Sequence, residues 1–319
     1  MDRMRTNSEV SPTILQRSTL LQMGDDDRGI RRLRAAGIVT PVRRGAYSLT
    51  ADQASIQPWE RHALVVTATV PKLGSGAVVS HVSAAALHDL ALWPTRLLPV
   101  HISRRITGGG RRTRTLHLHP ASLVEGDIVA VNGLSVTSVT RTVIDVARTE
   151  PFETGVVAAD EALRRGLTTR EELLDGLASQ RGRAGCYRAA RVVAFADGRS
   201  ESVGESRSRV AILRMGLEPP ELQVNVHDVD GVWLARADFA YVQRKVIGEF
   251  DGRIKYGSTQ ALSLGATDAL IAEKRRAEAL ERTGWIVVRW MWSDLQSPAL
   301  IHHRLLQAFD RSARLSPTR

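Results

Sequence analysis

The chain has almost no cysteine. Its 319 residues include a single one, Cys186, so neither an internal disulfide nor a cysteine-based zinc site can form. Cys186 has no recognisable catalytic context, and we expect it to be buried or inert. A reducing, intracellular setting fits this composition.

Long apolar segments are missing as well. The longest apolar run, 63–70, is interrupted by threonines and falls far short of the roughly 20 residues that a membrane-spanning helix needs. Residues 1–10 carry charges and no apolar core, so we expect no signal peptide. These absences predict a soluble, cytoplasmic protein with no membrane partner.

Motifs of several enzyme classes are also absent. The sequence has no Walker A motif, no HExxH, no dinucleotide fingerprint after a strand and no GxSxG elbow. Any catalytic chemistry must therefore come from another arrangement of residues.

Basic residues are in excess, and nearly all of them are arginine. With four lysines among 44 basic residues (44 − 4), 40 are arginine, and the formal net charge is +10. Such a surplus favours a polyanionic partner, most simply nucleic acid. The alternative is that the arginine content reflects a GC-rich genome.

The length and composition predict a multidomain α/β protein. At roughly 150 residues per domain the chain is long enough for about two cores, and its 43% hydrophobic and 24% charged residues are ordinary globular values. The polar stretch 196–200 contains glycine and is typical of a linker. We predict three segments: 1–57, 58–195 and 200–319.

The first segment has the pattern of a winged helix-turn-helix. Apolar spacing predicts a helix over 12–22 and a second over 26–36, which Gly37 ends. A two-stranded wing is expected over 39–49, with its turn at 43–45. Arginines suited to phosphate and guanine contacts lie on the second helix and at the wing tip: Arg28, Arg31, Arg32, Arg34, Arg43 and Arg44. A helical hairpin with a solvated basic face is the alternative.

Several stretches of the first half match a known pattern: 33–39 (LRAAGIV), 44–47 (RGAY), 80–90 (SHVSAAALHDL) and 136–145 (VTSVTRTVID). They resemble AbiEi-type antitoxins, the repressor halves of type IV toxin–antitoxin systems. That family usually has glycine where this chain has Asp89. The resemblance implies binding to promoter DNA and autoregulation, and it leaves open whether a cognate toxin exists.

The second segment is predicted to be mixed α/β. Alternation indicates strands at 100–102 and 116–119, and helices are expected between 154 and 178 with a break at 166–169. His117 and His119 lie on one strand face and could ligate a metal, but no third ligand is evident, so a solvated strand face is the favoured interpretation. Arginines surround the glycines of a loop at 108–110, so the loop either contacts a DNA backbone or is a solvated surface loop. These arginines are Arg104, Arg105, Arg111, Arg112 and Arg114.

The third segment predicts the order helix, three strands, helix, strand. The expected bounds are 202–215 for the first helix, 222–226, 234–241 and 245–251 for the strands, 269–283 for the second helix and 285–291 for the last strand. We expect Trp285, Trp290 and Trp292 to pack in the core or at the sheet edge.

Carboxylates gather on these elements. Asp238 and Glu249 lie on consecutive strands, and Asp251 shares the face of Glu249. Glu205, near the start of the preceding helix, can join them. Converging carboxylates repel each other unless a cation neutralises them, and hard oxygen ligands select Mg²⁺ or Mn²⁺. The alternative is an ion-pair cluster with arginine: Arg236, Arg253 or Arg289.

Four stretches of the third segment match a known pattern in sequence and in the order of helices and strands. They are Asp238-Phe239, 246–252 (VIGEFDG), Arg275-Arg276 and 284–289 (GWIVVR). They resemble the PD-(D/E)XK nuclease fold and, within it, the uncharacterised domain related to very-short-patch-repair endonucleases. The resemblance implies a restriction-endonuclease-like αβββαβ domain over the last third of the chain.

Two positions depart from that pattern. The lysine of the general motif would stand at 251, where this chain has Asp251. The related domain often has histidine three residues after Gly252, where this chain has Lys255. Lys255, or Lys274 on the next helix, would then supply the base, because arginine does not readily deprotonate.

The resemblance implies definite roles for these residues. Asp238 and Glu249 hold the metal, Glu205 and Asp251 assist, and Lys255 activates or orients water. Our leading hypothesis is therefore a protein that binds double-stranded DNA and hydrolyses its phosphodiester bonds with Mg²⁺ or Mn²⁺. The alternatives are a repressor or antitoxin with a catalytically silent nuclease fold, and a protein-interaction scaffold.

Overall fold

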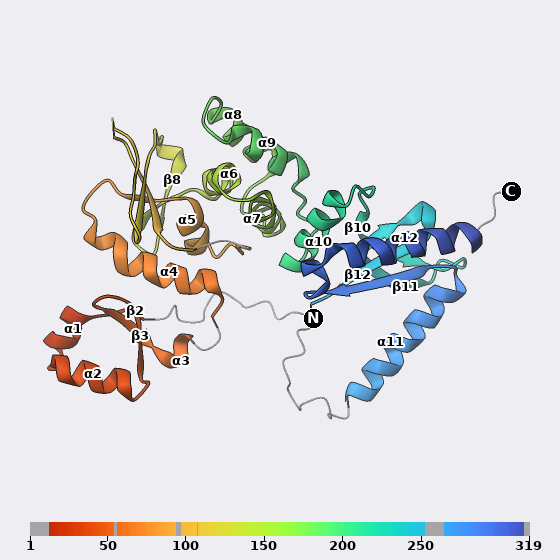
Figure 1. Cartoon of the computed structure of the whole chain (residues 1–319), viewed down its shortest axis with the longest axis horizontal. Coiled ribbons are helices and arrows are strands. Elements are labelled where there is room, and N and C mark those ends of the chain that lie inside the picture. Colours follow the sequence, from red (N-terminus) through yellow and green to blue (C-terminus); the bar gives the residue numbers. More distant parts are fainter. Residues whose placement is uncertain (1–12, 54–55, 94–96, 107, 253–264, 316–319) are drawn as a thin grey trace. The chain divides into compact units, whose positions relative to one another are not determined.

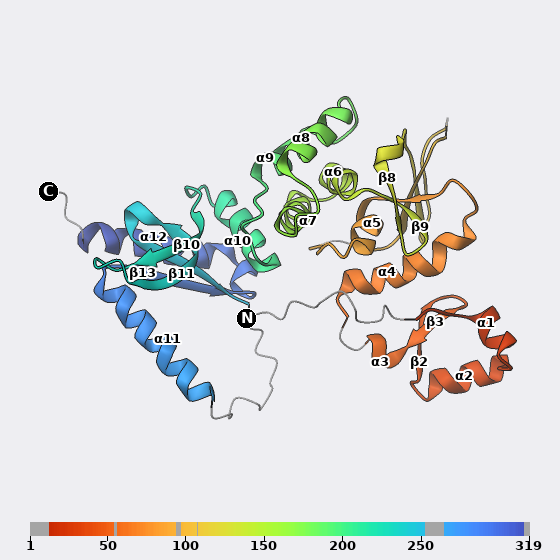
Figure 2. The ribbon, with the colours of Figure 1, turned by 180° about the vertical axis from the view of Figure 1, so that it is seen from behind.

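The computed structural model describes residues 13–53, 56–93, 97–106, 108–252 and 265–315 (Figure 1 and, from behind, Figure 2). Contacts divide the chain into two compact units, one formed by 1–162 and 166–195 and the other by 163–165 and 196–319. The described helices and three sheets confirm a mixed α/β protein. Among the described residues, no helix has the length and apolar character that crossing a bilayer requires.

The first unit begins with a small antiparallel sheet and short helices. Its strands are in the order β1-β3-β2. The elements are β1 (Leu15–Gln16), α1 (Arg17–Gln22), α2 (Asp27–Ala35), β2 (Val39–Arg43), β3 (Ala46–Leu49) and α3 (Thr50–Gln53). The second predicted helix and the two predicted wing strands are confirmed.

The first predicted helix is wrong at its start. Leu15 and Gln16 form strand β1 and pair with Tyr47 and Ala46 of β3, and the helix begins only at Arg17. Local spacing favoured helix through these residues, but pairing with a distant strand overrides a weak local preference.

A mixed six-stranded sheet forms the rest of the strand structure of this unit, in the order β6-β7-β5-β4-β9-β8. The strands are β4 (Val78–Val79), β5 (Val100–Arg104), β6 (Arg111–Arg112), β7 (Leu116–Pro120), β8 (Ile128–Val131) and β9 (Leu134–Thr137). Both strands predicted here, in β5 and β7, are confirmed.

Helices accompany this sheet: α4 (Pro58–Thr69), α5 (His81–Leu87), α6 (Val139–Thr149), α7 (Phe152–Arg164), α8 (Arg170–Ser179) and α9 (Cys186–Phe195). The predicted break at 166–169 lies between α7 and α8. Thr169 caps α8 by accepting a hydrogen bond from the Glu172 amide, and the Glu172 side chain returns to the Thr169 amide. This reciprocal capping is the reason why α8 begins where it does.

The second unit contains a four-stranded sheet in the order β10-β11-β12-β13. Its first two pairings are antiparallel and the last is parallel. The elements are α10 (Val203–Arg214), β10 (Glu221–His227), β11 (Trp233–Tyr241), β12 (Val246–Asp251), α11 (Gly265–Arg282), β13 (Ile286–Met291) and α12 (Pro298–Leu315). The predicted order of helices and strands up to β13 is confirmed.

Two apolar clusters cover this sheet. One joins α10 and α12 to Phe239, Val246 and Trp290, and the other joins Leu280 of α11 to Ala240 and Ile247. Alternate strand residues point to opposite faces, so α11 lies against the face opposite to α10 and α12. The prediction that Trp290 packs in the core is confirmed.

Two glycines allow this close packing. A Cβ on Gly204 of α10 would lie 1.9 Å from the Phe250 ring, and one on Gly248 would lie 2.4 Å from the Trp290 ring. Helix α12 was not predicted, although its buried residues Ile301, Leu305, Ala308 and Phe309 follow a helical period.

Candidate functional site

Helix α2 carries the predicted DNA-binding arginines. Asp26 caps the helix by accepting a hydrogen bond from the Gly29 amide, and Ile30 anchors it as a buried residue. Arg17 of α1 binds both carboxylate oxygens of Asp27 at 2.8 and 2.7 Å, which ties the two helices together. The helix is therefore fixed by its acidic start and its apolar side.

The other side of α2 is basic and exposed. Arg28, Arg31, Arg32 and Arg34 are all exposed. Arg31 and Arg34 also line an open hollow of about 450 Å³ beside Thr40 and Pro41 of β2. Four exposed guanidinium groups on two helical turns suit contact with phosphates.

The two arginines of the β2–β3 turn differ. Arg43 is half-buried and donates a hydrogen bond from Nη1 to the Ala68 carbonyl oxygen of α4 at 2.9 Å. Arg44 is exposed and precedes Gly45, whose φ of +77° suits a tight turn. Arg44 is therefore placed for contact with a ligand in solvent, whereas Arg43 joins the turn to α4.

In the second unit, Asp238 lies on β11 and accepts a hydrogen bond from the Phe250 amide of β12 at 2.8 Å. Burial raises the pKa of Asp238 to about 6, the Phe250 hydrogen bond opposes this shift, and the charges of Glu205 and Glu249 add to it. The structure thus brings Asp238, Glu205 and Glu249 close enough to interact electrostatically.

Glu205 lies in the first turn of α10 and is buried. It accepts hydrogen bonds from the Glu201 amide at 2.9 Å, the Ser202 hydroxyl at 2.8 Å and the Gln223 side-chain amide at 2.8 Å. Burial nevertheless raises the pKa of its carboxyl above the ordinary value. Its oxygens are therefore held in place by neighbouring donors.

Glu249 is held by two arginines. Arg289 of β13 lies 2.7 Å from Glu249 Oε2, and Arg276 of α11 lies 3.1 Å from Oε1. The ion pair with Arg289 was one alternative that the sequence raised. Arg236, another suggested partner, instead pairs with Glu201.

The remaining predicted site residues are Asp251 and Lys255. Asp251 is exposed at the end of β12, and Lys255 lies outside the described residues, as does Arg253. Within the described ranges, Asp238, Glu249 and Asp251 are not among the residues whose side chains lie close enough together to hold a metal ion. A metal bound there would need these side chains to move closer.

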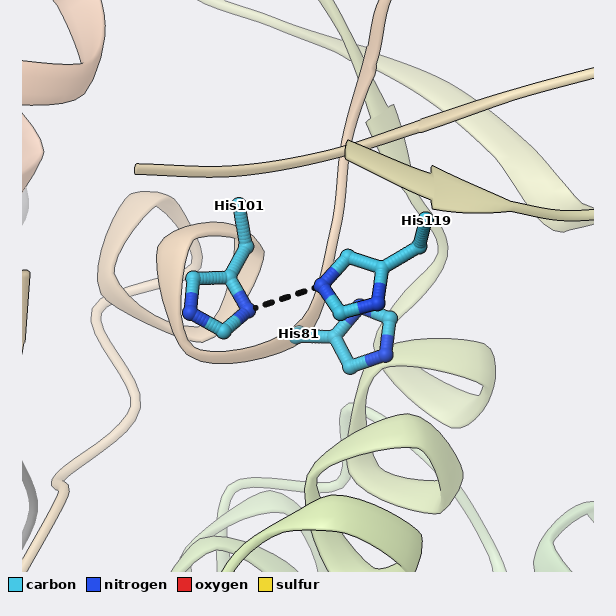
Figure 3. A group of neighbouring side chains, drawn as sticks. All are labelled: His81, His101 and His119. Atoms are coloured by element: carbon cyan, nitrogen blue, oxygen red, sulfur yellow. Dashed lines mark hydrogen bonds between the residues drawn. The ribbon is translucent and has the colours of Figure 1, made fainter. Parts of the chain in front are cut away.

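A histidine cluster in the first unit was missed. His81, His101 and His119 bring candidate ligand atoms within 4.8 Å of one another (Figure 3). His117 and His119 share one face, as predicted, with ring centroids 3.8 Å apart. The interpretation of a solvated strand face is wrong, because His81 and His101 are buried and His119 is half-buried. The parallel pairing of β5 with β7, which no local pattern reveals, brings the cluster together.

Comparisons with known proteins give no function. No family model matches the chain. Two uncharacterized proteins from strains of Mycobacterium tuberculosis, MT2308 and Rv2248, are each 29% identical over 242 residues, covering 75% of this chain and 84% of theirs. The crystal structure of the RV2827C protein from Mycobacterium tuberculosis is similar at 17% identity and a TM-score of 0.36, covering 67% of this chain and 79% of that one.

Proposed function

We propose that the protein binds double-stranded DNA through its N-terminal elements and hydrolyses phosphodiester bonds with the second unit, aided by Mg²⁺ or Mn²⁺. The N-terminal elements would form a winged helix-turn-helix, and the second unit would have a restriction-endonuclease-like core. The observation that carries the catalytic part is that Asp238 and Glu249 lie on adjacent strands, with Glu205 near enough for its charge to raise the pKa of Asp238.

The DNA-binding part rests on the order β1, α1, α2, β2, β3 and on the arginines of α2. That order suits a helix-turn-helix with a wing, in which the second helix enters the major groove. Arg28, Arg31, Arg32 and Arg34 would contact phosphates and base edges, and Arg44 would extend the contact from the turn.

The catalytic part rests on electrostatics. The raised pKa of Asp238 reflects burial beside other carboxylates, and a bound cation would relieve that repulsion. Asp238 and Glu249 would hold the ion, and Glu205 and Asp251 would support them. A divalent metal in such a site supplies an activated water and stabilises the leaving oxygen. Lys255 would orient or deprotonate the water.

A cleavage assay tests this proposal. Wild type and Asp238→Asn are incubated with plasmid and with mismatched duplexes in Mg²⁺, Mn²⁺ or EDTA. We expect metal-dependent cutting by the wild type and its loss in the variant, since asparagine keeps the hydrogen-bond acceptor for Phe250 but removes the charge. Equal cutting by both proteins would contradict the assignment.

A second function is a repressor or antitoxin in which the nuclease fold is silent. It is favoured by the two arginines that already neutralise Glu249, and by Asp251 at the position of the motif lysine. It predicts binding to the protein's own promoter, weakened by salt and by Arg31→Ala or Arg32→Ala, without cutting under any metal condition. Binding that ignores sequence would count against it.

A further inference from the structure

Three elements of the first unit direct histidines to one place. In the parallel pairing of β5 with β7, His101 lies opposite His117 and Ser103 lies opposite His119. Opposite residues point to the same face, so all three histidines share a sheet face. Helix α5 adds His81, whose ring stacks on that of His119 with the centroids 3.8 Å apart, and Ser83 of the same helix accepts a hydrogen bond from the His101 amide at 2.8 Å.

The spacing of the ring nitrogens suits a metal ion. His119 Nε2 lies 3.1 Å from His101 Nδ1, and the ligand atoms of His81, His101 and His119 all lie within 4.8 Å of one another. Two nitrogens bound at about 2.0–2.1 Å to one tetrahedral ion lie about 3.3–3.4 Å apart, close to the spacing of the His119 and His101 nitrogens. The His81 ring is stacked on His119 and would have to turn out of that stack to add the third ligand. We propose that His81, His101 and His119 form a binding site for one divalent transition-metal ion of the Zn²⁺ class.

Serine side chains position these rings. Ser103 Oγ donates to Ser80 Oγ at 2.8 Å, and Ser80 Oγ lies 2.9 Å from His81 Nδ1. A hydrogen bond at Nδ1 leaves Nε2 of His81 as the nitrogen that can bind the ion. Such hydrogen bonds from surrounding residues orient metal-binding histidines and select their tautomer.

Two further features point to a ligand. His117, whose ring centroid is 3.8 Å from that of His119, has a buried Nδ1 with no hydrogen-bond partner. His81 has a φ of +55°, a left-handed conformation that costs energy in a residue other than glycine. That conformation places its ring against His119, with the centroids 3.8 Å apart. The same cluster therefore contains a strained backbone conformation at His81 and a buried ring nitrogen without a hydrogen-bond partner at His117.

Acidic residues pair with the two arginines whose charges reach His81. Arg141 and Arg148 lie near enough to lower the pKa of His81, and Arg112 does the same to His117. Asp145 neutralises both arginines, at 2.9 Å each, and Asp127 lies 2.8 Å from Arg141. Imidazole ligands suit zinc, copper, nickel and iron, whereas the harder Mg²⁺ and Mn²⁺ prefer oxygen. Three histidines leave a fourth position for water or for His117.

Metal content and cobalt spectroscopy test the proposal on the full chain without an affinity tag. The protein is stripped with a chelator, dialysed and titrated with Co²⁺, which replaces Zn²⁺ and reports a tetrahedral nitrogen site through its visible absorption. We expect one equivalent of Co²⁺ to bind, Zn²⁺ to displace it and Mg²⁺ to leave it in place. Failure of the wild type to bind either ion saturably at micromolar concentrations would overturn the proposal.

Variants locate the site. His101→Gln/His119→Gln should weaken binding by about 100-fold or more, because two ligands are lost. His303→Gln, which changes an exposed histidine of α12, is the matched control and should bind like the wild type. Far-UV circular dichroism checks that the variants fold, and single His119→Gln replaces the double variant if the latter does not. Undiminished Co²⁺ binding in a folded variant would contradict the assignment.

Discussion

The two polar clusters of this protein differ in how their buried groups are held. In the second unit, arginines and amide donors surround the carboxylates, as with Glu249 between Arg276 and Arg289, although burial raises the pKa of Asp238 and of Glu205. In the first unit, the buried histidines are neutral, because burial lowers the pKa of His81 to about 3 and that of His101 to about 2. An acid cluster thus favours a hard cation, and a neutral imidazole cluster favours a softer one.

The largest expected effect comes from breaking the ion network beside the histidines. Asp145 is buried and pairs with Arg141 and Arg148. Removing one partner of a buried pair leaves unmatched charge, so Asp145→Ala should lower the free energy of unfolding by about 3–5 kcal/mol. Urea denaturation measures this, and a loss below about 1 kcal/mol would show that the network contributes little.

The next largest effect should be a loss of folding stability at low pH, caused by the buried histidines. The pKa of buried His81 and of His101 is lower in the folded than in the unfolded chain, so the unfolded state takes up protons first as pH falls below about 6.5. Each then costs up to about 2 kcal/mol of stability at pH 5, and this loss is absent above pH 6.5. Thermal unfolding of the metal-free protein between pH 7.5 and 5 measures this loss of stability. If the variant His81→Gln/His101→Gln lost as much stability as the wild type, groups other than these histidines would be the cause.

Disturbing the packing of α10, the helix that carries Glu205, should have a somewhat smaller effect. Gly204→Ala places a Cβ against the Phe250 ring and so pushes α10 and Glu205 away from the sheet. We expect a loss of about 1–3 kcal/mol in unfolding free energy. Gly126→Ala, where no atom lies within 4 Å of the added Cβ, is the control and should be nearly neutral.

The sequence predicted part of the fold and of the carboxylate cluster in the second unit. The order of elements in the second unit followed from apolar periodicity, and the closeness of Asp238 to Glu249 followed from two adjacent strands. The arginines that bind Glu249 came from β13 and α11, 40 and 27 residues away. The histidine cluster was hidden because strands β5 and β7 are parallel neighbours, a pairing that depends on the whole fold. Strand β1 was hidden because its partner lies 30 residues later along the chain, as Gln16 pairs with Ala46.

Relieving the carboxylate repulsion should give a small gain in stability. The folded pKa of Asp238, about 6, lies above its unfolded value, so its ionisation at neutral pH destabilises the fold, and this cost disappears below about pH 4. In metal-free buffer at pH 7.5, Asp238→Asn should raise the unfolding free energy by about 1–2 kcal/mol, after allowance for partial solvent exposure. Denaturation at pH 7.5 and pH 4 measures the difference; an equal gain at both values would argue against the charge as its cause.

The exposed arginines of α2 should leave stability unchanged while altering DNA affinity. Arg31→Ala and Arg32→Ala should each lower the slope of log K against log salt by about 1, because each removes one phosphate contact. Gel-shift titrations over a range of salt concentrations measure the slope. Arg183→Ala, in the loop before α9, is a control of the same charge change and should have no effect.

The proposed function is tested most directly by cleavage of duplex DNA in Mn²⁺ and in EDTA, with wild type and Asp238→Asn compared at equal concentration. Cutting that needs the metal and disappears in the folded variant is the predicted result. Absence of cutting by the wild type in Mg²⁺ and Mn²⁺, with DNA binding intact, would contradict catalysis and leave a DNA-binding protein with a silent nuclease fold.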